Sequence, residues 1–306
     1  MSEFINIDSI ADVHRLLGIG PPLHPLISVV THVPEMNTEL TDMKINFGLY
    51  FISLKIDIKG SFLYGRKSYD FEEGTIIYVA PGQVITVNKD PVLDFSGWTL
   101  FFHPDLIRQY NLGRSIKNYS YFKYDTNEAL QLSDKEKTCL SKFIEEITNE
   151  ISQHLDKHSQ TLIVHNLEAI LKYSDRFYER QFLTRTPYHS DLVIRFSEFL
   201  DDCFESHQLP DKGSPTVTQC GEALNMSGHY LSDLLKNETG KSIKEHIHLK
   251  LIDIAKLKLL NSSLSISEIA YGLGFDYPQN FSKLFKVKTG FSPSDYRTHL
   301  CKSAIL

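Results

Sequence analysis

The chain has 306 residues, of which 42% are hydrophobic, and its formal net charge is −6. This length and composition exclude a disordered tail and predict a folded protein of more than one domain. The charge is uneven, because residues 210–306 hold 12 Lys and Arg against 9 Asp and Glu (+3), whereas the preceding residues hold 20 against 29 (−9). A mildly basic region on an acidic body points to a polyanion as the partner of the C-terminal region.

The cysteines and the N-terminal residues exclude several other classes of protein. The four cysteines lie far apart without a C-x-x-C pair, which argues against a zinc site and against a disulfide framework. The N-terminus, MSEFINIDSIADVHRLL, lacks the basic flank and apolar run of a signal peptide, and no run of about eighteen apolar residues occurs. We therefore expect a cytoplasmic protein without a membrane partner.

Residues 27–102 carry the pattern of short β-strands. Segments such as FGLYFISLKIDI and GTIIYVAPGQVITV are rich in aromatic and β-branched residues, and Gly, Pro, Asn and Asp cluster between them. Many short strands separated by turns are typical of a sandwich or a barrel. We expect this domain to occupy residues 1–130.

Helical patterns follow in residues 131–208. Ser133 and Glu136 have the spacing of a capping box at the start of the first helix. Three apolar stripes with i, i+3 and i+4 spacing then predict three amphipathic helices. Their members are Leu140, Phe143, Ile144, Ile147, Ile151 and Leu155; Ile163, Leu167, Ile170, Leu171 and Phe177; and Leu192, Phe196, Phe199 and Leu200. Such stripes most often pack within their own domain, and the alternative is that the first two helices form a homodimer contact.

Residues 209–306 contain an internal repeat. TVTQCGEALNM at 216–226 matches SISEIAYGLGF at 265–275, and LSDLLKNETGKS at 231–242 matches FSKLFKVKTGFS at 281–292. Each copy has a small residue, Gly221 or Ala270, where a second helix has to approach closely. Four positions later each copy has Asn225 or Gly274, which tolerate the left-handed backbone of a sharp turn. The repeat predicts two helix-turn-helix units, at about 216–239 and 265–289.

Capping residues mark where each predicted helix begins and ends. We expect Gly240 and Gly290 to end the second helix of each unit. The expected caps at helix starts are the pairs Thr216 and Gln219, Ser265 and Glu268, Ser242 and Glu245, and Ser292 and Asp295, together with Ser227 and Asp276.

The second helix of each unit is predicted to have a buried and an exposed face. The buried faces are Leu231, Leu234 and Leu235, and Phe281, Leu284 and Phe285. The exposed faces are polar or cationic: His229, Ser232, Asp233 and Lys236 in the first copy, and Gln279, Ser282, Lys283 and Lys286 in the second. Gln pairs well with adenine and Lys with guanine or phosphate, so these faces suit the major groove of double-stranded DNA.

A single helix from Ser242 to about Leu260 is expected to join the two units, with Ile243, Ile247, Leu251 and Ile254 buried. Its length is about 28 Å, and major-groove segments on one side of DNA lie about 34 Å apart. The spacing therefore suits two reading helices on adjacent groove segments. The alternative is a small helical bundle without DNA.

The segment ISEIAYGLGFDYPQNFSKLFKVKTGFSPSDYR resembles the C-terminal signature of the AraC/XylS family of bacterial transcription regulators. The resemblance covers about the last ninety residues, and it implies DNA contacts from the residues above and from Asn280. The chain departs from the family at Gly228, where proline is often found, and at Asp233, where a basic residue is frequent. The strand-rich domain resembles the cupin-like sensor domain of these regulators, with a jelly-roll fold.

Metal and enzyme chemistry find little support. Residues 33–102 lack histidine, which a metal-dependent cupin needs. His154 and His158 have a zinc-binding spacing without the Glu of H-E-x-x-H, and no G-x-S-x-G occurs. We expect no catalytic residue, no metal and no cofactor.

The leading hypothesis is an α+β protein that regulates transcription by binding specific DNA. Residues 1–130 would sense a small-molecule effector, residues 131–208 would link and dimerise, and residues 209–306 would bind DNA. RNA polymerase is a further partner that activation would require. The alternatives are a cupin-fold enzyme with a helical appendage and a DNA-binding regulator without a ligand.

Overall fold

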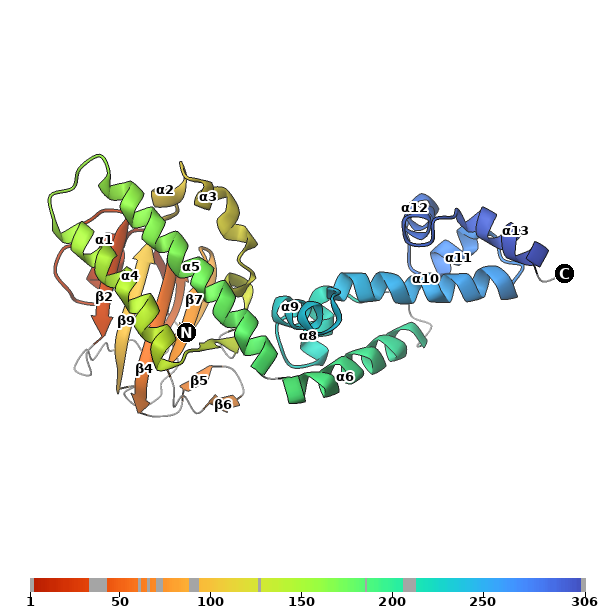
Figure 1. Ribbon diagram of the computed structural model, residues 1–306, viewed down its shortest axis with the longest axis horizontal. Coiled ribbons are helices and arrows are strands. Elements are labelled where there is room, and N and C mark those ends of the chain that lie inside the picture. Colours follow the sequence, from red (N-terminus) through yellow and green to blue (C-terminus); the bar gives the residue numbers. More distant parts are fainter. Residues whose placement is uncertain are drawn as a thin grey trace. The chain divides into compact units, whose positions relative to one another are not determined.

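A computed structural model describes residues 3–32, 43–59, 62–64, 67–69, 74–87, 94–125, 128–184, 186–205 and 213–303. The chain divides into two compact units, Met1–Thr184 and Arg185–Leu306. The first unit combines β-sheets with helices and the described part of the second is helical, as Figure 1 shows. The α+β class expected from the sequence is confirmed.

The first unit contains three sheets. A five-stranded sheet has the order β10-β7-β4-β9-β2, a three-stranded sheet has the order β1-β3-β8, and β5 pairs with β6. The strands are β1 (Glu3–Ile7), β2 (Ile27–His32), β3 (Met43–Phe47), β4 (Tyr50–Lys59), β5 (Phe62–Tyr64), β6 (Lys67–Tyr69), β7 (Thr75–Val79), β8 (Gln83–Val87), β9 (Asp94–Phe102) and β10 (Leu130–Gln131). The helices are α1 (Ile10–Leu16), α2 (Pro104–Ile107), α3 (Asn111–Ser115), η1 (Ile116–Asn118), η2 (Ser120–Lys123), α4 (Asp134–Ser152) and α5 (Ser159–Thr184).

Alternation along the central strands gives the five-stranded sheet two buried faces. Phe51 of β4 and Phe101 of β9 are paired in register and enter a core that also contains Ile45 of β3 and Ile10 of α1. Side chains one position along a strand point to the opposite face. There, Trp98 of β9 is also buried. The apolar and aromatic strands predicted from the sequence therefore fill space on both sides of the sheet.

Helices α4 and α5 pack on each other and are tied to this second face. The Trp98 indole Nε1 donates to Ser141 Oγ of α4 over 3.1 Å, and the hydroxyl of Tyr78 in β7 donates to Ser174 Oγ of α5. The predicted apolar stripes of both helices are largely buried. Leu155 differs, because it lies beyond the end of α4 and its side chain is exposed.

The second unit contains α6 (Thr186–Glu205), α8 (Val217–Ala223), α9 (Gly228–Thr239), α10 (Ile243–Asn261), α11 (Ile266–Gly272), α12 (Pro278–Thr289) and α13 (Pro293–Ser303). Helix α6 packs against α8 and α9. Its Asp201 pairs with Lys250 of α10, and its Phe196 meets the ring of His246 of α10 edge-on, with centroids 5.6 Å apart. The helical segment 131–208 is thus shared between the two units, while its proposed role as a linker stays a prediction.

The described residues contain neither a membrane-spanning helix nor a cluster of metal ligands. None of the helices in these ranges has both the length and the apolar character needed to cross a bilayer. No three His, Cys, Asp or Glu side chains among the same residues are grouped as metal ligands would be.

Candidate nucleic-acid interface

Both predicted helix-turn-helix units are present, and their turns have the same backbone. Asn225 has φ of 59° and Gly274 has φ of 79°, the left-handed conformation expected from the repeat. In the first unit the Met226 amide donates to the Gly221 carbonyl over 3.0 Å, and in the second the Phe275 amide donates to the Ala270 carbonyl over 3.1 Å. The repeated letters therefore encode a repeated turn.

Close backbone contact explains two glycines of the first unit. A Cβ at position 221 would lie 2.5 Å from the backbone nitrogen of Gly228 and 2.6 Å from the Met226 carbonyl oxygen. A Cβ at position 228 would overlap the Val217 carbonyl oxygen. Helices α8 and α9 thus approach more closely than any residue with a side chain allows. Proline, frequent at position 228 in the family, has no room here.

Capping side chains begin most of these helices as predicted. Three capping boxes are complete: Thr216 with Gln219, Ser242 with Glu245, and Ser265 with Glu268. Ser292 Oγ donates to Asp295 Oδ2 over 2.6 Å and accepts from the Asp295 amide over 3.1 Å at the start of α13. Ser227 Oγ accepts from the Tyr230 amide at the start of α9.

The expectation that Asp276 caps α12 is wrong. The N-cap of α12 is Tyr277, whose side chain makes no capping hydrogen bond, and Pro278 is the first helical residue. Proline has no N–H to satisfy and its ring presets the helical φ angle, so this helix starts without a capping carboxylate.

The two second helices, α9 and α12, end at left-handed glycines. Gly240 has φ of 73° and Gly290 has φ of 82°, as expected. Leu231, Leu234 and Leu235 of α9 are buried. Phe281 and Phe285 of α12 are buried too, while Leu284 is half-buried.

Every predicted DNA-binding residue lies outside these buried faces. Six are exposed: His229, Lys236, Gln279, Asn280, Lys283 and Lys286. Three are half-buried: Ser232, Asp233 and Ser282. The structure therefore groups the predicted residues on the outer faces of α9 and α12.

Sequence reasoning passed over Val287, which shares the exposed face of α12. Its side chain is 72% exposed, and it lies one turn beyond Lys283. Polar and cationic residue types mark a DNA-binding face in a sequence, so an apolar side chain on that face has no such signal. The repeat could have shown it, because Val287 matches Asn237 of α9, which is also exposed.

Helix α10 joins the two units as one continuous helix of 19 residues. It packs against α8 and α9 on one side of the repeat and against α11, α12 and α13 on the other. Ile243, Ile247 and Leu251 are buried as predicted, whereas Ile254 is only half-buried. At its far end Arg297 donates to the carbonyls of Leu259 and Leu264 over 3.1 and 2.7 Å, so this arginine of the signature holds the loop before α11.

Lysines of both reading helices lie near the first turn of α10. Hydrogen bonds from Ser242 lower the pKa of Glu245, and the charges of Lys288 and Lys236 lower it further. Burial lowers the pKa of His248, and Lys244 and Lys288 add to this effect. Cations from α9, α10 and α12 therefore create a positive field around this turn.

The first compact unit of the chain, Met1–Thr184, has a polar interior beside its apolar core. The hydroxyls of Ser53 and Thr99 are buried and 2.7 Å apart. One register step further along the same face, Lys55 lies opposite Thr75, and burial lowers the pKa of the lysine to about 8. Thr75 Oγ1 is buried and has no hydrogen-bond partner among the described residues.

Comparison with known proteins supports the assignment of the C-terminal region. A family model described as a helix-turn-helix domain matches residues 220–299. The chain is 26% identical over 259 residues to the uncharacterized HTH-type transcriptional regulator YfiF of Bacillus subtilis, covering 81% of this chain and 76% of YfiF. It is 37% identical over 84 residues to the Msm operon regulatory protein of Streptococcus mutans, covering 28% of this chain and 30% of that protein.

A solved structure is similar to about a third of the chain. The C-terminal domain of AraT, a response regulator from Geobacillus stearothermophilus, is 32% identical, with a TM-score of 0.29, over 34% of this chain and 88% of that one. Both relatives are named as regulators of transcription or of an operon. With its two helix-turn-helix units joined by α10, the chain carries a C-terminal AraC-type helix-turn-helix domain, and the relatives that it matches are named as transcription regulators.

Proposed function

We propose that the chain binds a specific operator as a homodimer and changes transcription in response to a small molecule held by its first unit. The observation that carries the DNA-binding part is the repeated turn geometry, which presents two polar helix faces on one continuous helix. A small helical bundle that does not bind DNA would not require a second copy of the turn with the same geometry.

In this proposal α12 supplies most of the base reading. Gln279 lies in the first turn of the helix, where it would pair with adenine, and Lys283 lies one turn later, where it would reach guanine or phosphate. Lys286 would contact phosphate, and Val287 would contact a thymine methyl group. None of these side chains is needed for the buried face.

Helix α9 would contribute a second, weaker set of contacts. His229, Ser232 and Lys236 face outward or lie at the edge of the exposed face. Asp233 is acidic and would accept a hydrogen bond from a cytosine amino group, while it repels phosphate. We therefore expect α9 to add specificity more than affinity.

The polar interior of the β-sheet unit supports the proposal that this unit binds an effector. Buried polar groups are normally hydrogen-bonded, so the Thr75 hydroxyl is suited to a ligand that offers a partner. The position lies between the two larger sheets, where a cupin-like sensor would hold its effector. Residues 1–130 would form this sensor, and residues 131–208 would link it to the DNA-binding domain at 209–306.

The protein would act in the cytoplasm, and it would contact RNA polymerase if it activates transcription. The α4–α5 hairpin would supply the homodimer contact. The hairpin is suited to this role because it covers one face of the sheet and leaves its other side outward (Figure 1). A dimer doubles the number of reading helices on one operator.

The test is selection of bound sequences from random duplex DNA with the full chain. We expect enrichment of two short sites about one helical turn apart, repeated for a dimer. The same selection with Gln279→Ala should relax the preference at one base position without unfolding the chain. Failure of the unaltered chain to enrich any sequence would contradict the proposal.

A further inference from the structure

Helices α4 and α5 line a groove on the unit Met1–Thr184 that is distinct from the polar interior proposed for the effector. It has a volume of about 440 Å³, within the range of small-molecule sites. Its lining residues are Lys135, Glu136 and Cys139 of α4 and Tyr173, Arg176, Phe177 and Arg180 of α5. Because α5 is hydrogen-bonded to Tyr78 of β7 and to Tyr121 of η2, the groove has a fixed wall.

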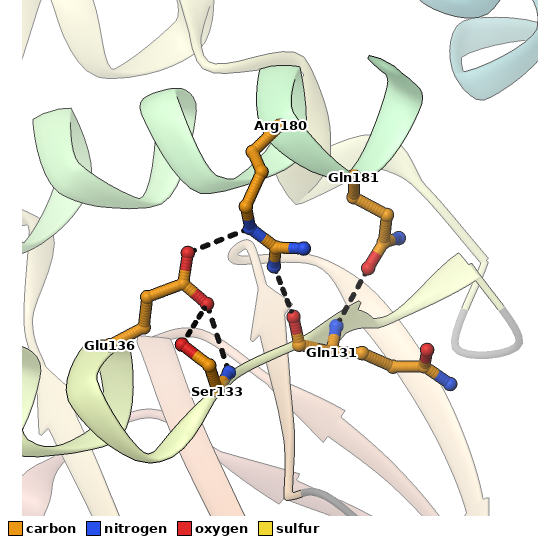
Figure 2. Close-up of polar contacts among 5 residues, drawn as sticks. All are labelled: Gln131, Ser133, Glu136, Arg180 and Gln181. Carbon is orange, nitrogen blue, oxygen red and sulfur yellow. Dashed lines mark hydrogen bonds and ion pairs between the residues drawn. The ribbon is translucent and has the colours of Figure 1, made fainter. Parts of the chain in front are cut away.

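The charges around the groove do not balance. Three cationic side chains face one carboxylate, that of Glu136. This carboxylate is fully engaged: Oε1 accepts from Arg180 Nε over 2.7 Å, and Oε2 accepts from the amide and hydroxyl of Ser133 over 2.9 and 3.0 Å (Figure 2). Within the described ranges, Lys135 and Arg176 have no ion-pair partner. The groove therefore has a surplus of positive charge.

Arg180 is held in place before any ligand binds. Besides its contact with Glu136, its Nη2 donates to the Gln131 carbonyl over 2.7 Å, and the Gln131 amide donates to Gln181 Oε1 over 2.8 Å (Figure 2). These bonds connect α5, α4 and β10 around one guanidinium. A fixed guanidinium loses little conformational entropy on binding an anion.

The positions of the other two cations are unfavourable for the helices themselves. Lys135 is in the first turn of α4, where the helix dipole favours negative charge. Arg176 lies four residues from Lys172 and from Arg180 on α5, a spacing at which like charges repel. A bound anion would relieve both costs.

The floor of the groove is apolar and aromatic. Phe177 is 7% exposed, and the ring of Tyr173 lies between those of Phe143 and Phe177, with centroids 5.6 and 5.9 Å away. Cys139 adds a half-buried thiol. An inorganic ion would leave this floor empty, whereas a molecule with an apolar body would cover it.

We propose that this groove binds a small organic anion, with its carboxylate or phosphate at Lys135, Arg176 and Arg180 and its apolar body on Tyr173 and Phe177. The site lies on the helix-covered side of the sheet, away from the polar interior between the sheets. It is independent of the proposed reading of DNA, because binding is measured without DNA.

The thiol of Cys139 reports on occupancy. The full chain is treated with iodoacetamide, and alkylation of each cysteine peptide is followed by mass spectrometry with Cys203 of the second unit as internal control. Naphthyl phosphate and naphthoate are the anionic probes, and naphthylmethanol is the neutral probe with the same apolar body. We expect at least one anionic probe to slow alkylation of Cys139 at a concentration about tenfold lower than the alcohol, while Cys203 is unaffected. The two anions distinguish a phosphate site from a carboxylate site.

Variants identify the groove as the cause. The double variant Lys135→Gln and Arg176→Gln should lose the tenfold preference for the anion, since it leaves the bonds of Arg180 intact. Lys142→Gln, which removes an exposed cation of α4 outside the groove, should keep it. Equal protection by the neutral alcohol, unchanged protection in the double variant, or no protection by any probe would overturn the proposal. Protection that rises with protein concentration without a probe would show a second copy of the chain in the groove, which also overturns it.

Discussion

The two helix-turn-helix units share a turn but differ in what surrounds it. In the first unit the helices touch through Gly221 and Gly228, and α6 covers the pair. In the second unit Ala270 takes the place of Gly221, proline starts the second helix, and that helix carries Lys283, Lys286 and Lys288. The first unit is specialised for packing, and the second has more of the charge that DNA binding requires.

From this difference we expect the two helix-turn-helix units to have different roles. Contacts from α6 reach α10 beside the first unit, through the pair of Asp201 and Lys250 and through the rings of Phe196 and His246. A signal carried by α6 would therefore reach the first helix-turn-helix unit. Affinity for DNA would depend more on the second helix-turn-helix unit. The following predictions test this division.

The largest effect is expected from filling the close contact of the first unit. Gly221→Ala should lower the free energy of unfolding by about 3 kcal/mol, because the added Cβ meets backbone atoms that cannot move aside. The matched change in the second unit, Ala270→Gly, should cost only about 1 kcal/mol through helix propensity and lost contact. Urea denaturation of the full chain measures both. Equal costs would show that the two units are packed alike.

The next effect concerns affinity for DNA. Lys283→Ala in the second unit should weaken binding to the selected operator by about 1 to 3 kcal/mol and reduce its salt dependence. The matching position of the first unit is Asp233, and Asp233→Asn should weaken binding less, because the lost cytosine contact is offset by weaker repulsion of phosphate. Titration of a fluorescent operator at several salt concentrations compares the two variants. A greater loss from Asp233→Asn would reverse the assignment of roles.

The smallest effect is the pH dependence that His246 of α10 contributes beside the first helix-turn-helix unit. Burial lowers the pKa of His246, which also contacts Thr239 Oγ1 through Nε2 over 2.8 Å. Because the folded protein then binds fewer protons than the unfolded chain, stability should fall as pH drops below about 6.5, the ordinary pKa of histidine. The second unit has Tyr296 at the matching position, packed against Phe285. Thermal unfolding between pH 7 and 5 should be less pH-dependent in His246→Gln, and an unchanged profile would contradict this origin.

The structure of the helical unit, Arg185–Leu306, was largely predictable because the sequence signals for its turns and caps are local. Capping pairs, left-handed glycines and the positions of Asn225 and Gly274 depend on a few neighbouring residues, and the repeat supplied a second copy of each. Asp276 has the residue type of an N-cap, but the proline two positions later is the first helical residue and makes Tyr277 the N-cap. The contact that requires Gly228 joins two helices and has no signature in a single segment.

In the β-sheet unit, Met1–Thr184, pairing between strands far apart in the sequence limited what could be predicted. Strand β1 is only five residues long and pairs in parallel with β3, some forty positions away, and β10 has two residues. The unmatched Thr75 hydroxyl and the groove between α4 and α5 arise only when such elements meet. The apolar stripe of α6 predicted a helix but not the unit to which it packs.

The continuity of α10 restricts how this protein can change over evolution. One residue added to a helix rotates everything beyond it by about 100° and advances it by about 1.5 Å. An insertion or deletion within α10 would therefore rotate α12 relative to α9, even if every contact within each unit survived. Substitutions on its surface carry no such penalty. We expect the length of α10 to be fixed far more strictly than the identity of its exposed residues.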